Sequence, residues 1–305
     1  MAASAAATDG PPLAGNIQVS LGRGTPEALM THPSGASCEV VLAGAHVTSW
    51  KTKDGVERLF VSSASEFGNG AAIRGGIPVC WPQFSGRGNL PKHGFLRTSS
   101  DWEIAEMSSE NGECRLVLSM CDSDATRELW PHKFEVRYAV TLSADGLDTE
   151  LEVINTGDAE LAFHAALHTY FSVSDVAGCT VTGLDGLTYE DNTQGGAVAQ
   201  ETRAELQITG EIDNVYLDAP SSLVLRYPQG AGQLRLSKSE SFRDVVLWNL
   251  GAEKAPSMKD LGAGEWQQYV CLEAAAIGTP VSLAPGATWK GSQSFACETP
   301  GCDAP

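Results

Sequence analysis

Two histidines lie four positions apart in the segment LAFHAALHTYFSV, residues 161–173. Leu161 and Phe163 share one parity of this segment, and His164 and His168 share the other. Because successive side chains of a β-strand point to opposite faces, a strand here packs its apolar face inward and presents both imidazoles on the other face. The spacing would suit a metal ion on a helix, but along a strand the rings lie about 13 Å apart. We therefore expect only one of them at a given reacting atom, as a general acid or base, and a hydrogen-bonded structural histidine is the alternative for each.

A carboxylate closes the apolar run QQYVCLEAAAIG, residues 267–278. Burying the carboxylate of Glu273 among apolar neighbours costs free energy unless the carboxylate is paired or takes part in a reaction. An apolar setting raises the pKa of a carboxyl group toward neutrality, which suits a group that exchanges protons with a substrate. The alternative is a glutamate at the end of a strand whose side chain turns into solvent.

The segment RGGIPVCWPQFSGRGNLPKHGFLR, residues 74–97, contains Arg74, Arg87, Lys92 and Arg97 and no acidic residue. The whole chain has a formal charge of −18, so the positive charge of this segment is opposite in sign to that of the chain. Guanidinium groups bind phosphate in a fork, and glycines let the backbone come close to a ligand, so the segment is typical of an anion pocket. The alternative is a solvated loop whose charges happen to agree.

Short alternating or apolar runs, separated by turn residues, must position these groups. The dipeptides Asp54-Gly55 and Asp145-Gly146 lie at strand-like runs and predict β-hairpins. Residues 147–153, LDTELEV, alternate apolar with acidic side chains and predict a strand with one buried and one wet face. Long helical periodicity and internal repeats are not visible, so the pattern favours an all-β sandwich or barrel.

The candidate residues are spread from position 74 to position 273, and no linker separates them. We therefore expect a single domain over residues 17–298. The Ala- and Gly-rich start, residues 1–16, is predicted to be a disordered extension, and residues 299–305 a flexible tail.

Composition excludes several classes of partner and location. Hydrophobic residues make up 42% and charged residues 19%, which is typical of a globular protein. The net charge of −18 argues against nucleic acid and anionic membranes as partners, and no run approaches the roughly 20 apolar residues of a membrane helix. The start lacks the basic and apolar regions of a secretory signal, so we expect a cytoplasmic protein, with organellar import as the alternative. The eight cysteines form no CxxC pair, which favours buried free thiols over disulfides or a zinc site.

Six short segments, taken in order, resemble the aldose 1-epimerase (galactose mutarotase-like) superfamily, and within it the glucose-6-phosphate 1-epimerase branch. The segments are RGGIPVCWPQF (74–84), HGFLR (93–97), ALHTYFSV (166–173), IDNVY (212–216), DVVLWN (244–249) and VCLEAA (270–275). The resemblance implies a large antiparallel β-sandwich of the galactose mutarotase-like kind, with few short helices and an open groove across one sheet. It also implies a small-molecule hexose phosphate as substrate. We separately expect a monomer.

The resemblance further implies roles for individual residues. His168 is the expected general acid and Glu273 the expected general base. The expected substrate-binding residues are Arg74, Lys92, His93, Arg97 and Asp213. Lys92 is a departure, because relatives in this branch often have glutamine just before the HGF motif.

Interconversion of the two anomers of an aldose needs one acid and one base. A proton goes to the ring oxygen, another leaves the C1 hydroxyl, and the opened aldehyde re-closes on its other face. This reaction requires no metal and no organic cofactor. Two other readings remain within the same family: a mutarotase acting on unphosphorylated sugar, and a non-catalytic carbohydrate-binding protein in which Trp81 stacks on the sugar. A glycoside hydrolase that uses Asp213 and Glu273 as its carboxylate pair is a further alternative.

Overall fold

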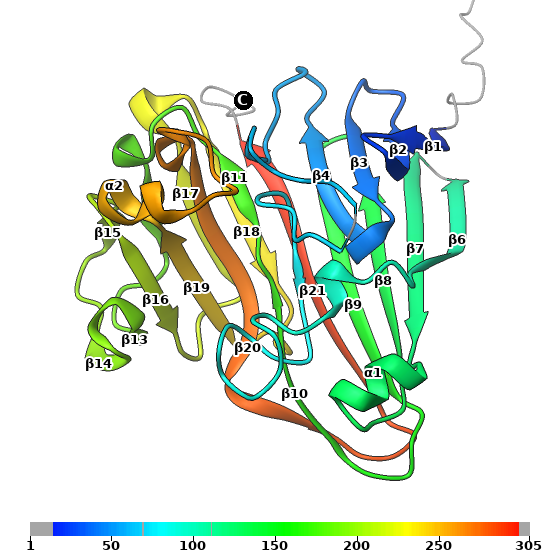
Figure 1. Cartoon of the computed structure of the whole chain (residues 1–305). Coiled ribbons are helices and arrows are strands. Elements are labelled where there is room, and N and C mark those ends of the chain that lie inside the picture. Colours follow the sequence, from blue (N-terminus) through cyan, green and yellow to red (C-terminus); the bar gives the residue numbers. More distant parts are fainter. Residues whose placement is uncertain (1–14, 69, 111, 299–305) are drawn as a thin grey trace, which may run out of the picture.

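The computed structural model describes residues 15–68, 70–110 and 112–298, and within them the strands form three antiparallel sheets (Figure 1). The first sheet has four strands in chain order. They are β1 (Asn16–Gly22), β2 (Thr25–Thr31), β3 (Ser37–Val41) and β4 (His46–Lys51).

The second sheet has nine strands in the order β15-β12-β17-β18-β21-β9-β8-β7-β6. Their bounds are β6 (Glu103–Glu110), β7 (Glu113–Cys121), β8 (Phe134–Leu142), β9 (Gly146–Asn155), β12 (Thr180–Thr182), β15 (Glu205–Gln207), β17 (Ser222–Arg226), β18 (Gln233–Lys238) and β21 (Thr288–Glu298). The alternation expected for residues 147–153 is confirmed, because Leu147, Leu151 and Val153 are buried on β9 while Asp148 is exposed.

The third sheet has eight strands and carries the histidine segment. Its order is β14-β13-β16-β19-β20-β10-β5, and β11 also pairs with β20. The bounds are β5 (Val79–Cys80), β10 (Leu161–Leu167), β11 (Tyr170–Ser172), β13 (Thr188–Asp191), β14 (Ala197–Gln200), β16 (Ile212–Tyr216), β19 (Asp244–Asn249) and β20 (Tyr269–Leu283). The first nine residues of β20 are buried whichever face they point to, which explains why its sequence is apolar without alternation.

Helices are short in the described part of the chain. The α-helices are α1 (Asp124–Leu129) and α2 (Gly251–Lys254), and the 3-10 turns are η1 (Ala43–Ala45), η2 (Leu96–Thr98), η3 (Val176–Gly178), η4 (Asn192–Gln194), η5 (Pro228–Gly230), η6 (Ala255–Ser257) and η7 (Glu265–Gln268). Ser123 begins α1 with a capping box, in which its hydroxyl accepts from the backbone N–H of Thr126. Within these residues no helix is long and apolar enough to cross a membrane.

The core lies between the eight- and nine-stranded sheets. Phe171 of β11 contacts Phe295 of β21, with ring centroids 5.0 Å apart, and Phe163 of β10 contacts Trp289 of the same strand at 5.6 Å. Trp50 of β4 also packs against Phe295, at 5.8 Å, and so joins the four-stranded sheet to this core. The predicted antiparallel β-sandwich with few short helices is therefore confirmed.

The two predicted hairpins differ. The Asp145-Gly146 turn joins β8 to β9, and the N–H of Ser143 donates to the carbonyl of Gly146 at 3.1 Å. At Asp54-Gly55 a turn also forms, with Gly55 at φ 78°, a conformation that glycine adopts without strain. Its second arm, however, pairs with β4 only through an isolated bridge between Lys51 and Glu57. The chain after this turn leaves the sheet and runs toward the loop of residues 62–97.

The expectations for the chain ends fall mostly outside the described residues. Residues 1–14 and 299–305 are not described, and Asn16, assigned to the extension, begins β1. The single domain over 17–298 stays a prediction. All seven cysteines of the described residues are free thiols, most of them buried, although Cys121 is exposed.

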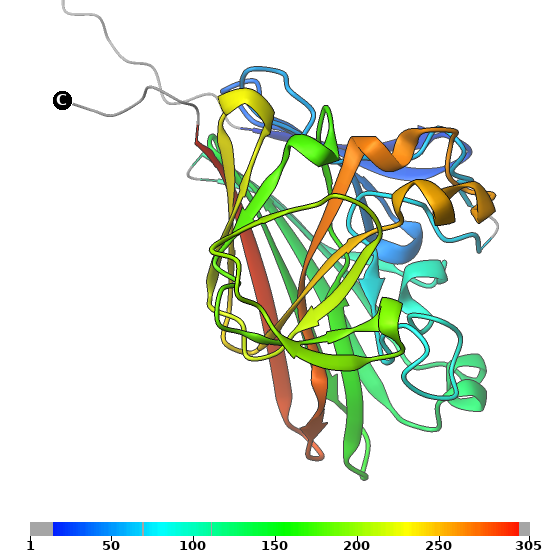
Figure 2. The same cartoon turned by 90° about the vertical axis from the view of Figure 1, so that its left-hand side faces the viewer.

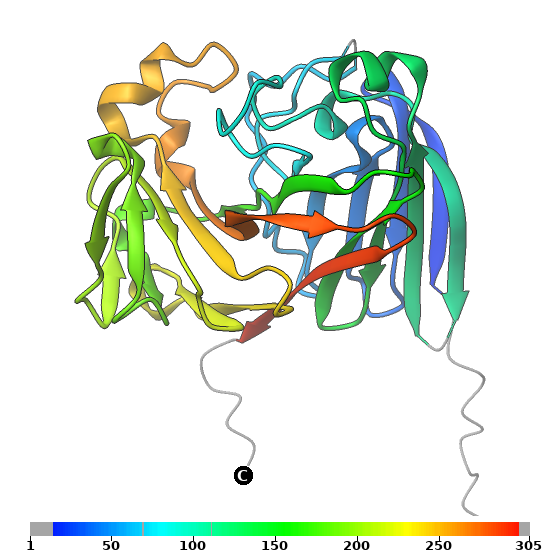
Figure 3. The same ribbon diagram turned by 90° about the horizontal axis from the view of Figure 1, so that it is seen from below.

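Two loop regions lie on the same side of the eight-stranded sheet. Figures 2 and 3 show the cyan segment, around residues 62–97, and the orange segment that follows β19, around residues 251–268, on one side of the molecule. Together they cover the face of the sheet that is turned away from the core.

Candidate active site

A cavity of about 270 Å³ lies between these loops and the eight-stranded sheet. All the residues that the sequence proposed for catalysis and substrate binding line it. They are Arg74, Lys92, His93, Arg97, His168, Asp213 and Glu273. Residues separated by almost two hundred positions in the chain thus share one site, because neighbouring strands and the loops beside them bring them together.

His168 and Glu273 are neighbours across two strands. In the antiparallel register, Leu167 pairs with Ala274 and Tyr170 with Cys271, so His168 stands opposite Glu273. Side chains opposite each other in such a ladder lie on the same face and within contact distance. The Nδ1 atom of His168 lies 3.2 Å from Oε1 of Glu273, and the two side chains are 9% and 1% exposed. The ring is not aimed at the carboxylate, and neither atom has a hydrogen-bond partner among the described residues.

Burial sets the protonation of this pair. It raises the pKa of Glu273 well above its usual value, and nearby Asp213 adds to that shift. It lowers the pKa of His168 well below its usual value, and His93 and the cationic Arg74 and Arg97 act in the same direction. Both shifts favour uncharged side chains. In the neutral pair Glu273 carries the transferable proton and is the acid, and the neutral imidazole of His168 is the base.

Aromatic rings surround the imidazole of His168. The ring stacks on Tyr170 at a centroid distance of 4.8 Å and an interplanar angle of 10°. Trp248 of β19 meets it edge-on at 5.6 Å, and the ring of His93 lies at 5.4 Å. His168 also lines the cavity, so its ring can meet a ligand there.

His93 is held by the loop backbone. It has φ 66°, which is uncommon for a residue other than glycine. Its N–H donates to the carbonyl of Ser85 at 3.1 Å, and its Nδ1 accepts from the N–H of Ser85 at 3.3 Å. The proton of the neutral ring therefore sits on Nε2. Burial, with the charges of Arg97 and Lys92, lowers the pKa of His93 to about 3, so the ring stays a neutral hydrogen-bond donor.

Arg74 is already paired with a carboxylate. Its Nε and Nη2 donate to Asp260 at 3.1 and 2.8 Å, and Nη1 donates to the hydroxyl of Tyr170 at 3.1 Å. Asp260 comes from the loop that follows α2 and also lines the cavity. The acid-free segment 74–97 therefore does not make an acid-free pocket, because another loop supplies the counter-charge.

Lys92 and Arg97 carry the uncompensated positive charge. Arg97 donates from Nη2 to the carbonyl of Lys92 at 3.0 Å, and its buried Nε has no partner among the described residues. In that part of the chain neither residue forms an ion pair with a carboxylate. Arg87, the remaining cation of the segment, is not among the residues that line the cavity and is paired with Glu190.

Two glycines of this segment, Gly76 and Gly94, are required by the packing of the backbone. A Cβ on Gly76 would lie 2.1 Å from the carbonyl oxygen of Val47, and one on Gly94 would lie 2.0 Å from that of Trp81. Both have positive φ, at 61° and 72°. They allow loop and strand backbones to touch, which corrects the interpretation that they let a ligand approach the backbone.

The sequence reasoning missed several lining residues. They are Tyr170, Asn192, Trp248, Lys254 and Asp260. Tyr170 and Trp248 were within recognised segments and could have been read by parity, since they point to the same face as His168. Asn192 donates to Asp213 at 2.7 Å, and burial raises the pKa of that carboxyl group. Asn192 and Asp260 lie in turns and Lys254 ends the short helix α2, and no sequence pattern marks any of the three.

Two other candidates are not among the lining residues. His164 is half-buried on β10, and its N–H donates to the carbonyl of Pro82 at 2.8 Å. This agrees with the expectation that only one of the two histidines meets the substrate. Trp81 is fully buried among other aromatic rings, including Trp130 at 4.9 Å. It cannot stack on a sugar, which corrects that part of the carbohydrate-binding alternative.

Known proteins resemble this chain over most of its length. The family model described as aldose 1-epimerase matches residues 26–296. A protein of Cenchrus ciliaris, provisionally named glucose-6-phosphate 1-epimerase, is 36% identical over 263 residues, covering 83% of this chain and 79% of that protein. A protein of Escherichia coli K12 with the same provisional name is 30% identical over 249 residues, covering 81% and 82%. The crystal structure of a provisionally named mutarotase from Salmonella typhimurium superposes with a TM-score of 0.85 at 27% identity, covering 93% of this chain and 94% of that one.

Proposed function

Since this chain belongs to the aldose 1-epimerase family, we propose that it is an isomerase that interconverts the α and β anomers of glucose 6-phosphate. The observation that carries the proposal is the buried contact between His168 and Glu273 at the floor of a cavity whose free cations are Lys92 and Arg97. The pair supplies the acid and the base, and the cations supply a place for a phosphate.

In the proposed reaction His168 and Glu273 act on the two oxygens bound to C1. Glu273 takes the proton of the C1 hydroxyl while His168 gives a proton to the ring oxygen, so the C1–O5 bond breaks and C1 becomes a carbonyl. Rotation about C1–C2 presents the other face. On re-closure the ring oxygen returns its proton to His168, and Glu273 returns its own to O1. No proton or electron is gained or lost, and the two groups end as they began.

The shifted pKa values fit an exchange of roles within the pair. Each shift favours the neutral side chain, so the single proton of the resting pair stays on Glu273 until a ligand arrives. Hydrogen bonds donated by bound sugar hydroxyls stabilise the ionised form of Glu273, so the proton of its carboxylic acid moves to His168 when substrate binds. Proton transfer by a positioned side chain typically accelerates such a step by about 10² to 10⁴.

In this proposal different cations bind the phosphate and the sugar ring. Lys92 and Arg97 have no carboxylate partner among the described residues, so they can bind a dianion without breaking an ion pair. Arg74 is neutralised by Asp260 and keeps N–H groups free for a neutral hydroxyl. His93 and Asp213 add a neutral donor and an acceptor for other hydroxyls.

The same pairing of Arg74 favours the second candidate, a mutarotase for unphosphorylated sugar. If Asp260 keeps Arg74 neutral, the positive charge of the cavity is smaller than the sequence of the loop implies. The two candidates use the same acid and base and differ only in what Lys92 and Arg97 bind.

Optical rotation tests both candidates. The purified protein is added to freshly dissolved α-glucose 6-phosphate and to α-glucose, each against a buffer blank. We expect faster equilibration for both sugars and a larger kcat/KM for the phosphate. Equal values would favour the second candidate, while binding without acceleration, or release of a reducing sugar from a glycoside, would contradict both.

The reaction scheme consists of proton transfers, so we also propose that activity survives dialysis against a strong chelator. Activity lost on dialysis and restored by zinc would contradict this. The monomeric state and the cytoplasmic location stay predictions, which sedimentation and cell fractionation would test.

A further inference from the structure

A buried hydrogen bond crosses the sandwich directly behind His168. Gln293 lies on β21 of the nine-stranded sheet and is 2% exposed. Its Nε2 donates to the hydroxyl of Thr169 at 3.1 Å. Thr169 follows His168 in the chain and is fully buried. The bond therefore ties the backbone that carries His168 to the opposite sheet.

The backbone at His168 is a local turn and not regular strand. The N–H of Thr169 donates to the carbonyl of Leu167 at 2.9 Å, which places His168 in the middle of a three-residue turn. This turn lies between β10 and β11, and both strands pair with β20. The flanking strands are fixed, but the turn needs its own anchor if the imidazole is to keep one position.

The ring itself has weak anchors. Its Nδ1 has no hydrogen-bond partner among the described residues, so the ring is oriented by stacking on Tyr170 and by its own backbone. The backbone N–H of His168 donates to the carbonyl of Pro78 at 3.0 Å on one side of the turn. On the other side the N–H of Leu272 on β20 donates to the carbonyl of Thr169 at 3.2 Å, and Gln293 adds a bond from the opposite sheet to the hydroxyl of Thr169.

An amide is an unusual choice at this position of the core. The neighbours of Gln293 on its own strand and face include Phe295, and an apolar side chain of similar length could fill the same volume. The Oε1 atom of Gln293 has no partner among the described residues, which is unfavourable for a buried polar atom. Packing alone therefore does not account for the residue.

We propose that Gln293 is a positioning residue for the acid–base pair. By holding Thr169, it keeps the three-residue turn in place, and with it the 3.2 Å contact between His168 and Glu273. A displacement of about 1 Å in a reacting group can reduce a rate by about 10²-fold, so a bond that touches no substrate can still set kcat. This inference rests on the proposed function, in which His168 acts on the ring oxygen.

The test compares isosteric variants of the full chain in the optical-rotation assay. Gln293→Met and Thr169→Val each remove the bond while keeping the volume, and Thr169→Ser keeps the hydroxyl. We expect the first two to lower kcat about 10-fold or more, with KM changed by less than about two-fold. Thr169→Ser should keep kcat within about two-fold. The double variant Gln293→Met/Thr169→Val should be no slower than either single variant, because the two residues act through one bond.

Thr149 offers a matched control. It is the register partner of Gln293 on β9, is 1% exposed, and makes no described hydrogen bond to Thr169. Thr149→Val should keep kcat even where it lowers Tm as much as Gln293→Met. Normal kcat in Gln293→Met, or an equal loss in Thr149→Val, would overturn the positioning role. His168→Asn in the same series separates the two proposals, since full activity there would overturn the proposed function itself.

Discussion

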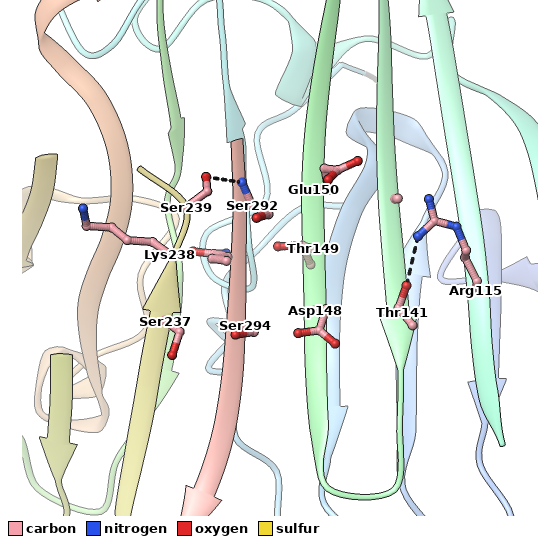
Figure 4. Close-up of a pocket in the computed structure, with 12 residues that line it drawn as sticks. Arg115, Thr141, Asp148, Thr149, Glu150, Ser237, Lys238, Ser239, Ser292 and Ser294 are labelled. Atoms are coloured by element: carbon pink, nitrogen blue, oxygen red, sulfur yellow. Dashed lines mark hydrogen bonds between the residues drawn. The ribbon is translucent and has the colours of Figure 1, made fainter. Parts of the chain in front are cut away.

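Two hollows of the described residues lie on different sheets. The groove on the nine-stranded sheet contains none of the candidate residues, whereas the candidate active-site cavity gathers them. A groove of about 450 Å³ lies on the outer face of the nine-stranded sheet, against about 270 Å³ for the candidate active-site cavity. We call it the serine groove, because Ser237, Ser239, Ser292 and Ser294 line it together with acidic and threonine side chains (Figure 4). Its walls come from the adjacent strands β18, β21, β9, β8 and β7.

The two hollows differ in whether their buried ionisable groups have hydrogen-bond partners. In the serine groove, Arg115 donates to the hydroxyl of Thr141 at 3.3 Å, and the N–H of Ser292 donates to the hydroxyl of Ser239 at 3.0 Å. Its buried cation, Lys238, has its pKa lowered to about 8 by burial, but its amine donates to backbone carbonyls, and Figure 4 shows the side chain running away from the serines.

In the cavity, by contrast, buried ionisable groups keep unused hydrogen-bonding atoms. His168 and Glu273 face each other without a hydrogen bond, and a buried nitrogen of Arg97 has no described partner. Ionisable side chains that converge, have shifted pKa values and lack hydrogen-bond partners mark a reactive site. A hollow on a regular sheet reflects the curvature of its strands.

The largest expected effect would come from removing the acid or the base. His168→Asn and Glu273→Gln should each lower kcat by about 10² to 10⁴-fold, since each abolishes one proton transfer, while KM changes much less. Optical rotation with glucose 6-phosphate measures both constants. Near-normal turnover in either variant would contradict the assignment.

His164 is the matched control for this prediction. It is a histidine on β10, four residues before His168, but it is not among the residues that line the cavity. His164→Gln should slow the reaction only modestly, by less than about ten-fold. A loss as large as that of His168→Asn would mean that the wrong histidine was chosen.

The next effect concerns the charge inside the cavity. Arg97→Ala should raise KM for glucose 6-phosphate by roughly 10- to 100-fold, the value of about 1.5–3 kcal/mol expected for a charge-assisted hydrogen bond. KM for glucose should change far less, Lys92→Gln should be milder, and added salt should weaken the preference for the phosphate. Initial rates with both sugars at two salt concentrations check this.

Arg74 sharpens the same prediction. The sequence groups it with Arg97 as a phosphate ligand, but its ion pair with Asp260 separates the two. We expect Arg74→Ala to raise KM for both sugars by similar factors. A rise in KM for the phosphorylated sugar alone would show that Asp260 releases Arg74 when substrate binds.

The contrast between these arginines shows how far sequence reasoning reaches. Strand parity and the order of motifs were enough to predict a β-sandwich and to bring His168 and Glu273 to one site. They could not reveal Asp260, because its contact with Arg74 joins two loops 186 positions apart and no periodicity records it. Nor could they show that Trp81 is a core residue, since an aromatic side chain in a loop motif looks the same whether it is buried or exposed.

A smaller effect is expected on stability in acid. His46 is fully buried behind the cavity, its Nε2 is 2.8 Å from the carbonyl oxygen of Gly75, and burial lowers its pKa to about 4. The unfolded chain binds a proton near pH 6.5 and the folded chain does not, so stability is complete above pH 6.5 and falls as the pH drops toward 4. At pH 5 this residue alone should remove about 2 kcal/mol.

Urea unfolding at pH 7 and pH 5 measures this change. His46→Gln should flatten the difference between the two pH values by about 2 kcal/mol, whatever it does to stability at pH 7. An unchanged difference would mean that His46 is protonated in the folded state. Buried His93, whose pKa is lowered to about 3, contributes in the same direction and should leave part of the pH dependence in the variant.

The smallest expected effect lies in the serine groove and tests the opening comparison directly. Asp148 of β9 lines the groove and Asp213 of β16 lines the cavity. Although Asp148 is exposed as a residue, partial desolvation of its carboxyl group by the groove walls, with the nearby charge of Glu113, raises its pKa, and burial raises the pKa of Asp213. Asp148→Asn and Asp213→Asn are therefore the same chemical change in two hollows. Asp213→Asn should raise KM by roughly ten-fold, because a charged acceptor for sugar hydroxyls becomes neutral.

Asp148→Asn should leave kcat and KM within about two-fold, and the free energy of unfolding within about 0.5 kcal/mol, as for most surface substitutions. The raised pKa of Asp148 means that its charged form is disfavoured by the fold, so the small change in stability should be a gain at pH 7. Optical rotation and urea unfolding measure the two quantities on one preparation. An increase in KM comparable to that of Asp213→Asn would show that the groove takes part in substrate binding, and the distinction drawn here from burial and unused hydrogen-bonding atoms would then fail.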